Sequence, residues 1–228
     1  MNNTLIPVAH IETDLPTKFG VPRQSGLVEG LKGRIVFEPE YRNPEALRGL
    51  DGFSHIWLLW DFSEARRDGE KWQPTVRPPR LGGNKRMGVW ATRSPFRPNN
   101  IGLSSVRIER IDLHTPQGPV IYVEGIDMMD GTPIYDIKPY LPFTDSHPDA
   151  RGGFAEEQNR NLVALEVCFD EGVKKVFTAD QLSALRGILS ADPRPHYHDD
   201  AQRTYAFEYA DKEVKFRVDG NEVHAWVE

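Results

Sequence analysis

The chain has 228 residues, of which 39% are hydrophobic and 27% are charged, and its net charge is −6 at pH 7. This composition is typical of a globular protein with a buried core and excludes a largely disordered chain. The single cysteine, Cys168, excludes an intrachain disulfide bond and a zinc site with several cysteine ligands. Residues 1–10 lack a secretory signal pattern, and the longest apolar run, residues 56–60, is too short to cross a bilayer. We therefore expect a cytoplasmic protein that does not bind membranes.

The first part of the chain alternates short strand-like runs with turns rich in glycine and proline. Strands are predicted, in chain order, at residues 5–11, 34–37, 53–62, 87–91, 106–113 and 120–124. Between the second and third runs, Asn43 as the N-cap and Pro44 in the first turn predict a short helix that ends at Arg48. Several short strands joined by such turns favour a barrel or sandwich of mainly antiparallel strands.

The second part of the chain begins after a polar, turn-rich stretch that is typical of a linker. Beyond this stretch we expect strands at residues 162–169, 214–218 and 222–227. A capping box formed by Thr178 and Gln181 predicts the start of a helix. The apolar stripe of this helix comprises Leu182, Leu185, Ile188 and Leu189. The prediction is a mainly β protein with an N-terminal domain at 1–145, a linker at 146–160 and a small α+β domain at 161–228.

Positive charge is concentrated in one segment of this acidic chain. Residues 71–108 hold eight lysines and arginines and no aspartate or glutamate. An ordinary solvated surface mixes both signs, because like charges repel one another. The same segment contains Trp72, Trp90 and Phe96, which could stack on bases while arginines contact phosphates. A basic surface loop without a ligand is the alternative, but the segment favours an anionic ligand, and a nucleic acid fits best.

Common nucleotide-binding and catalytic motifs are absent from the sequence. There is no P-loop, and Gly26, Gly30 and Gly33 have the wrong spacing for a dinucleotide-binding turn. No Ser/His/Asp or Cys/His triad can be assembled, and a metal site at His196 and His198 is not expected in their loop. Three classes stay open on the residues alone: an enzyme that acts on RNA, a non-catalytic RNA-binding module, and a hydrolase of a small anionic substrate.

Four motifs follow one another in a defined order. They are residues 21–24 (Val-Pro-Arg-Gln), 50–57 (Leu-Asp-Gly-Phe-Ser-His-Ile-Trp), 77–84 (Arg-Pro-Pro-Arg-Leu-Gly-Gly-Asn) with 88–99 (Gly-Val-Trp-Ala-Thr-Arg-Ser-Pro-Phe-Arg-Pro-Asn), and 130–140 (Asp-Gly-Thr-Pro-Ile-Tyr-Asp-Ile-Lys-Pro-Tyr). Together they closely resemble the TsaA-like (TrmO) family of tRNA methyltransferases. The resemblance covers residues 5–143 and continues through residues 188–195 in the C-terminal domain.

The resemblance implies an antiparallel β-barrel that forms a homodimer and binds S-adenosylmethionine outside the Rossmann scheme. The implied reaction is methylation of N6 of N6-threonylcarbamoyladenosine at position 37 of tRNA, with threonine tRNA as the expected substrate. Carried over residue by residue, the cofactor contacts are Pro22, Arg23, Gln24, Phe62, Ser63, Arg93, Leu103, Asp130, Gly131, Thr132 and Pro133. Ser63 stands where many family members have histidine.

The residue chemistry is compatible with this reaction. Arg23 or Arg93 could bind the cofactor carboxylate as a bidentate fork. Positioning and electrostatics accelerate an in-line methyl transfer, and no metal is expected because the sulfonium loses its charge as the methyl leaves. Tyr135 and Asp136 are candidate bases by residue type alone, so the catalytic residue stays unassigned.

The basic segment would then contact the tRNA. The phosphates of the anticodon stem-loop would be held by Arg77, Arg80, Lys85, Arg86 and Arg97. Trp90 is open between base stacking and packing in the core. The alternative to the enzyme is a non-catalytic RNA-binding module that uses the same segment.

Overall fold

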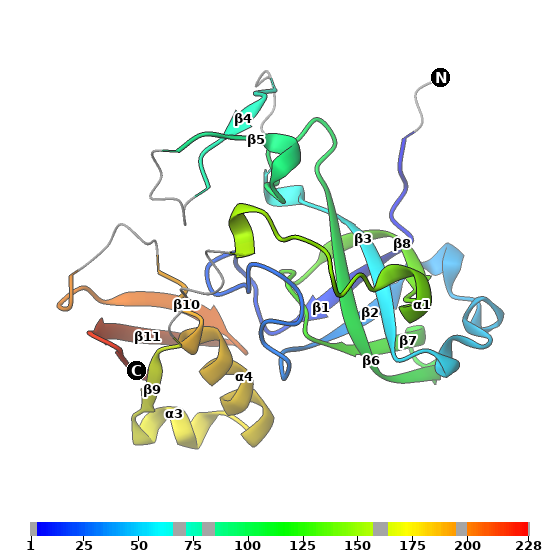
Figure 1. The fold of residues 1–228 in the computed structure, drawn as a ribbon. Helices are drawn as coiled ribbons and strands as arrows, with labels where there is room; N and C mark the ends of the chain where they lie inside the picture. The colour runs from blue at the N-terminus through cyan, green and yellow to red at the C-terminus, as the bar shows by residue number, and fades with distance from the viewer. Residues whose placement is uncertain (1–3, 66–71, 79–84, 157–163, 195–199, 228) are drawn as a thin grey trace.

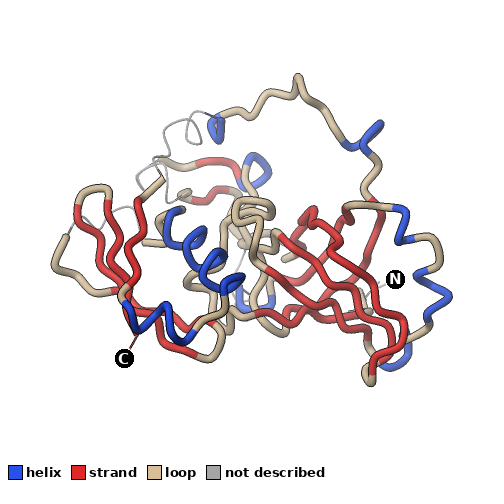
Figure 2. The backbone as a smooth tube through the Cα atoms, turned by 90° about the horizontal axis from the view of Figure 1, so that it is seen from below, coloured by secondary structure: helices blue, strands red, loops and turns tan. Residues whose placement is uncertain are grey.

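The structure is a computed structural model that describes residues 4–65, 72–78, 85–156, 164–194 and 200–227, and its strands fall into two main groups (Figures 1 and 2). The larger group is a closed barrel in the order β1-β2-β7-β6-β3-β8, with antiparallel neighbours throughout. Its strands are β1 (Ala9–Thr13), β2 (Lys32–Phe37), β3 (His55–Asp61), β6 (Ile101–Thr115), β7 (Gly118–Glu124) and β8 (Thr132–Pro139). The predicted mainly β fold with an antiparallel barrel is therefore confirmed.

Side chains along each barrel strand alternate between the interior and the outer wall. In β3, Ile56, Leu58 and Trp60 are buried, whereas Trp57 and Leu59 between them are half-exposed. This alternation follows from the two-residue period of a strand, which places successive side chains on opposite faces. The apolar set of β3 therefore faces the core of the barrel.

Short 3-10 helices connect β2 to β3 at Pro39–Tyr41, Pro44–Leu47 and Leu50–Gly52. The helix predicted after Asn43 is present in this 3-10 form, and the Asn43 side chain accepts a hydrogen bond from the Glu45 amide at 3.0 Å. The barrel domain also contains α1 (Pro142–Asp145), which follows β8.

The strand predicted at residues 87–91 is wrong beyond its first two residues. Only β5 (Met87–Gly88) is extended, and it pairs with the equally short β4 (Thr75–Val76). The chain then turns into a 3-10 helix at Val89–Ala91, closed by a hydrogen bond from the Thr92 amide to the Val89 carbonyl. The apolar sequence pattern at 87–91 does not distinguish a strand from a 3-10 helix, because a strand continues only where a neighbouring strand forms hydrogen bonds with it.

The smaller group of strands forms a four-stranded sheet in the order β10-β11-β12-β9, in which β9 runs parallel to β12. Its strands are β9 (Glu166–Phe169), β10 (Tyr205–Tyr209), β11 (Lys212–Asp219) and β12 (Glu222–Val227), accompanied by α3 (Glu171–Val176) and α4 (Ala179–Ser190). The strands predicted at 214–218 and 222–227 are present within β11 and β12, which pair as an antiparallel hairpin. The capping box is also present, because Thr178 Oγ accepts a hydrogen bond from the Gln181 amide and Gln181 Oε1 accepts one from the Thr178 amide. No helix within the described ranges is long and apolar enough to span a membrane.

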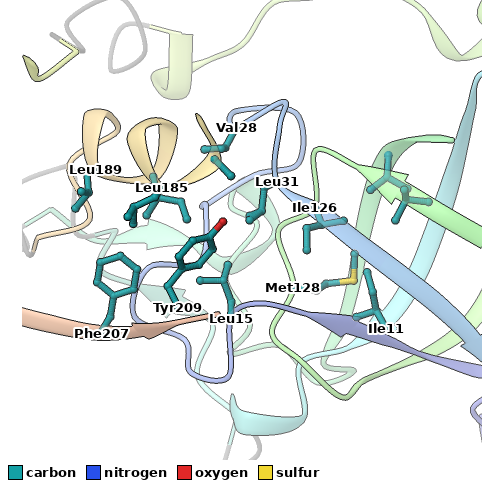
Figure 3. Close-up of a cluster of buried hydrophobic side chains, with 14 of the residues drawn as sticks. Ile11, Leu15, Val28, Leu31, Ile126, Met128, Leu185, Leu189, Phe207 and Tyr209 are labelled. Carbon is teal, nitrogen blue, oxygen red and sulfur yellow. The ribbon is translucent and has the colours of Figure 1, made fainter. Parts of the chain in front are cut away.

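The long loop at residues 14–31 joins the two groups of strands through one continuous hydrophobic core. Figure 3 shows Leu15 and Leu31 of this loop between Leu185 and Tyr209 on one side and Ile126, just after β7, on the other. All five side chains are at most 1% exposed. The backbone of a loop that contains neither helix nor strand is usually mobile. Burial of these side chains therefore holds the loop in one conformation.

Further contacts hold the loop against the C-terminal sheet. Phe19 lies 6.1 Å from Phe207 and 6.4 Å from Phe216, measured between ring centroids. The Ala210 amide donates to the Asp14 carbonyl at 2.9 Å. Where the loop enters β2, the ammonium group of Lys32 lies 3.0 Å from a carboxylate oxygen of Asp180 at the start of α4. The C-terminal sheet therefore determines where the middle of the loop lies.

Replacing Gly187 by alanine tests this junction. The new Cβ would lie 2.7 Å from Cγ1 of Val28, a buried and β-branched side chain with little freedom to move. Helix propensity alone would stabilise Gly187→Ala by about 1 kcal/mol, whereas overpacking costs about 1–3 kcal/mol. We expect a net loss in the free energy of unfolding, measured with urea. Gly52→Ala, where a Cβ meets no atom within 4 Å, is the matched control, and an equal effect in both variants would contradict the close packing.

Candidate functional site

Three loops meet at one end of the barrel. In an antiparallel barrel, the ends of β1, β3 and β7 lie at the same rim as the starts of β2, β6 and β8. The connecting loops at 14–31, 62–100 and 125–131 therefore share this rim. Hydrogen bonds join the first and third loops, from the Gly26 amide to the Gly125 carbonyl at 2.8 Å and from the Gly125 amide to the Leu31 carbonyl at 2.9 Å. The cofactor residues predicted from the sequence belong to these loops and to the first residues of β6 and β8.

Two of the predicted cofactor residues touch directly. The guanidinium group of Arg93 donates a hydrogen bond to the side-chain oxygen of Gln24, although 69 positions separate them in the sequence. Arg93 is exposed and Gln24 is half-buried, so both can be reached from solvent. Pro22 and Arg23 precede Gln24 in the same loop, half-buried and exposed respectively. The rim therefore presents an arginine fork beside an amide, a combination that suits a carboxylate or another planar anion.

The motif at residues 130–133 forms a tight turn that leads into β8. The Thr132 amide donates to the Met129 carbonyl, and Gly131 between them has a φ of 72°, a left-handed conformation that glycine adopts without strain. Asp130 accepts a hydrogen bond from the Thr13 amide at 2.9 Å, and the hydroxyl of Thr132 donates to the Met129 carbonyl at 2.8 Å. Pro133 lies opposite His10 of β1. The turn is thus tied to the end of β1.

The remaining predicted cofactor residues lie around the end of β3. Phe62 packs its ring against that of Trp60, with centroids 4.2 Å apart, and Ser63 is exposed at the start of a 3-10 helix. Leu103 is 53% exposed on the outer wall of the barrel and pairs with Leu59 of β3. The candidate base Asp136 pairs with Leu59 from the other side. The side chain of Leu103 therefore faces away from the barrel interior.

Asp127 is a rim residue that the sequence patterns did not single out. Its carboxylate accepts a hydrogen bond from the Ser104 hydroxyl at 2.6 Å and another from the Ser25 backbone amide. Ser104 in turn accepts the indole N–H of Trp60 at 2.9 Å. Partial burial of the carboxylate raises the pKa of Asp127 to about 6, although the hydrogen bonds and the positive charge of Arg93 oppose the shift. The sequence feature that could have identified Asp127 is its position as a single acidic residue in the otherwise apolar stretch 126–129.

The described part of the basic segment that precedes β6, residues 72–78 and 85–100, forms a largely exposed surface beside the rim, outside the barrel wall (Figure 1). The rings of Trp72 and Trp90 lie 6.0 Å apart, and the guanidinium carbon of Arg97 lies 5.4 Å from the centroid of the Trp90 ring. Trp90 is 66% exposed, so packing of this ring in the core, the alternative left open by the sequence, is wrong. Arg97 also donates to the Thr92 carbonyl at 2.8 Å, which holds the turn beneath the ring.

The predicted phosphate contacts are distributed over this surface. Arg77, Lys85 and Arg86 are exposed on or near the β4–β5 hairpin, where Arg86 donates to the Thr75 hydroxyl at 3.1 Å. Arg80 lies outside the described residues. Across the described ranges, no three His, Cys, Asp or Glu side chains gather as a metal site would require.

The fold and the rim define a class of protein in which loops at one end of an antiparallel barrel form a polar site beside a basic, aromatic surface. Models of two protein domains match this chain. The tRNA-methyltransferase O N-terminal domain matches residues 10–146, and the TrmO C-terminal domain matches residues 163–227. The chain therefore belongs to the TrmO family.

Individual relatives agree with this membership. The chain is 43% identical over 216 residues to the tRNA (adenine(37)-N6)-methyltransferase of Escherichia coli strain K12, covering 91% of this chain and 90% of the relative. It is 37% identical over 203 residues to a putative S-adenosylmethionine-dependent methyltransferase of Pseudomonas aeruginosa, covering 86% and 84%. A crystal structure of TrmO matches the fold with a TM-score of 0.78 at 29% identity, covering 100% of this chain and 99% of the other.

The raised pKa of Asp127 predicts a particular dependence of stability on pH. The folded protein binds the proton more tightly than the unfolded chain, so Asp127 favours folding most below pH 4, and this contribution is lost as the pH rises through 6. The free energy of unfolding of Asp127→Asn, relative to that of the natural protein, should therefore increase by about 1–3 kcal/mol when the pH is raised from 4.5 to 7.5. Urea unfolding of both proteins at the two pH values measures the difference, and an equal difference at both values would contradict the shift.

Proposed function

We propose that this protein transfers a methyl group from S-adenosylmethionine to N6 of adenine 37 in tRNA. The observation that carries the proposal is the match of the whole two-domain chain to the TrmO family, whose relative from Escherichia coli is named for this reaction. The rim site and the adjacent basic surface give the two ligands separate places, because a small zwitterion fits the rim and a polyanion fits the surface. A tRNA substrate also favours a cytoplasmic location.

The finer substrate proposal follows from the resemblance in the sequence motifs. The acceptor would be N6-threonylcarbamoyladenosine at position 37, and threonine tRNA would carry it. The anticodon stem-loop would then be the part of the tRNA that approaches the rim. In this division of labour, residues 1–145 bind both ligands and residues 161–228 support the loop at 14–31, with 146–160 as the linker.

The rim residues fit a cofactor that carries an amino-acid moiety. S-adenosylmethionine would supply a methyl group on a sulfonium, which becomes a neutral thioether after transfer. Arg93 exposes a guanidinium fork for the carboxylate, and Gln24 restricts the orientation of this fork. The turn at Gly131 has no side chain at its tip, so its backbone can approach a ligand closely. We assign the cofactor contacts to Pro22, Arg23, Gln24, Phe62, Ser63, Arg93, Leu103, Asp130, Gly131, Thr132 and Pro133.

A homodimer would complete this site. Leu103 faces outward from the barrel, whereas Gln24 and Arg93 lie on the rim, so the proposed contacts diverge within one chain. Leu103 and its neighbour Leu59 form an apolar strip on the wall, and Phe143 of α1 is 86% exposed. Exposed apolar side chains of this kind are typical of an interface between subunits. A two-fold arrangement would bring the wall of one subunit to the rim of its partner.

The basic segment would bind the tRNA backbone. Arg77, Lys85 and Arg86 are exposed cations that can neutralise phosphates, and Arg80 and Arg97 belong to the proposed set by their sequence positions. The exposed Trp72 and Trp90 rings offer faces on which unpaired bases can stack.

The first prediction from this proposal concerns cofactor binding. The purified protein should bind S-adenosylmethionine and S-adenosylhomocysteine in a calorimeter without added metal. Arg93→Ala should weaken this binding by about tenfold or more, because a charge-assisted fork is removed. Arg48→Ala, which removes an exposed arginine from the connection between β2 and β3, is the control and should bind normally. A flat titration of the folded protein would reject the methyltransferase and favour the RNA-binding module.

The second prediction concerns assembly. Sedimentation should show a dimer at micromolar concentration, and Leu103→Asp should shift it toward the monomer because a charge in an apolar interface is costly. The variant should also lose affinity for S-adenosylmethionine, since the site needs both subunits. An active monomer of the natural protein would contradict the proposal.

The third prediction concerns the basic surface. Replacing Arg77, Lys85 and Arg86 together by alanine should weaken tRNA binding by about 1 kcal/mol for each phosphate that is no longer neutralised, and the KM for tRNA should rise accordingly. The salt dependence of tRNA binding should become shallower, while affinity for S-adenosylmethionine stays unchanged. The control replaces Arg48, Lys174 and Lys175, which are equally exposed cations away from this segment. If the triple variant keeps the full salt dependence, the tRNA binds elsewhere.

A further inference from the structure

The carboxylate of Asp127 lies where the three rim loops meet. It belongs to the loop at 125–131, accepts the backbone amide of Ser25 in the first loop, and lies within electrostatic range of Arg93 in the second. Its Oδ1 atom also accepts the hydroxyl of Ser104, 2.6 Å away on β6. The Asp127 carboxylate therefore connects both other loops to the barrel wall.

These contacts flank the pair that carries the proposed cofactor site. Ser25 directly follows Gln24, and Gln24 accepts the hydrogen bond from Arg93. A carboxylate that holds Ser25 on one side and attracts Arg93 on the other restrains both members of this pair. We infer that Asp127 is a positioning residue that sets Gln24 and Arg93 in the arrangement that binds the amino-acid moiety of S-adenosylmethionine. This inference rests on the proposed function.

The hydrogen bonds around Asp127 favour positioning over direct contact with a ligand. Ser104 is itself fixed, because it is 1% exposed and accepts the indole N–H of Trp60 at 2.9 Å. The chain from Trp60 through Ser104 thus orients the carboxylate from beneath, while Ser25 and Arg93 lie toward the rim. The carboxylate would therefore act on the proposed ligand by holding Ser25 and Arg93.

The ionised carboxylate opposes folding rather than supporting it. Partial burial raises the pKa of Asp127 to about 6, so the charged form present at neutral pH is less stable in the folded protein than in the unfolded chain. An uncharged residue that kept the hydrogen bond with Ser104 would stabilise the fold at neutral pH. Charge retained against stability is typical of a functional position.

The test compares the full-length natural protein with Asp127→Asn. Asparagine keeps an oxygen for the Ser104 hydroxyl but removes the charge that attracts Arg93. We expect both Kd and KM for S-adenosylmethionine to rise by about tenfold, with a much smaller change in kcat and no decrease in Tm. The matched control is Asp112→Asn, because Asp112 is an exposed aspartate that also accepts a backbone amide, that of His114, and lies near the far end of β6. This control should bind S-adenosylmethionine like the natural protein.

A pH series provides a second readout. Among the described residues, Arg93 is the charged side chain within electrostatic range of Asp127. The other partners of Asp127, which are the Ser25 amide and the Ser104 hydroxyl, do not titrate in this pH range. Protonation of the carboxylate below pH 6 should therefore weaken the binding of S-adenosylmethionine by the natural protein. Asp127→Asn should bind weakly at all pH values from 5 to 7.

Three results would overturn the inference. If Asp127→Asn binds S-adenosylmethionine as tightly as the natural protein, Asp127 does not position the site, although the proposed function stands. Weaker binding together with a lower Tm would assign Asp127 to the stability of the fold instead. If the natural protein binds no S-adenosylmethionine, both the inference and the proposed function fail.

Discussion

The burial of the loop at 14–31 between the barrel and the C-terminal sheet is the interaction on which the site depends. Leu15, Val28 and Leu31 are removed from water on both sides, and each fully buried side chain of this size contributes about 1.5–3 kcal/mol. This gain offsets the entropy lost when a long irregular loop becomes ordered. If the loop packed against the barrel alone, the apolar side chains that now contact the C-terminal domain would be exposed to water. The C-terminal domain therefore acts on the site through packing, without contributing a predicted cofactor residue.

Fixing the loop at its apolar positions leaves its polar residues to form the rim. Gln24 and Ser25 lie between the buried anchors Leu15 and Val28, so their positions are set by contacts on both sides. The rim then closes through polar contacts, in which Arg93 binds Gln24 and Asp127 binds Ser25. A site built in this way is more rigid than a free loop would be, and rigid placement is what an in-line methyl transfer requires.

Charge is distributed in a pattern that serves the same reaction. The protein as a whole carries a net charge of −6, yet the segment at 71–108 contains no aspartate or glutamate. Its described residues before β6, 72–78 and 85–100, lie outside the barrel wall. An acidic body with one positive surface orients an approaching polyanion toward that surface. Because Arg97 lies over the exposed Trp90 ring, a cation and an aromatic face are presented together.

The sequence by itself determined the elements that depend on local patterns. The apolar run at 53–62 predicted β3, the alternating run at 106–113 predicted part of β6, the capping box predicted α4, and the long motifs predicted the family and a set of candidate site residues. Local patterns succeed here because they set backbone conformation and the side of an element that is buried. Local patterns predicted too long a strand at β5 and did not predict β8, since pairing with neighbouring strands decides whether an extended segment becomes a strand.

Tertiary structure alone decided which polar groups meet. The contact of Arg93 with Gln24 spans 69 positions, and the carboxylate of Asp127 reaches Ser25 across the barrel rim. The motifs had assigned Gln24 and Arg93 to one site, but residue spacing does not predict either contact, because closing a barrel brings distant loops together by strand order rather than by spacing. The outward direction of Leu103 is a similar case, fixed by its pairing with Leu59. Chemistry was thus encoded in residue types, and its geometry came from the closure of the barrel and the packing of one loop.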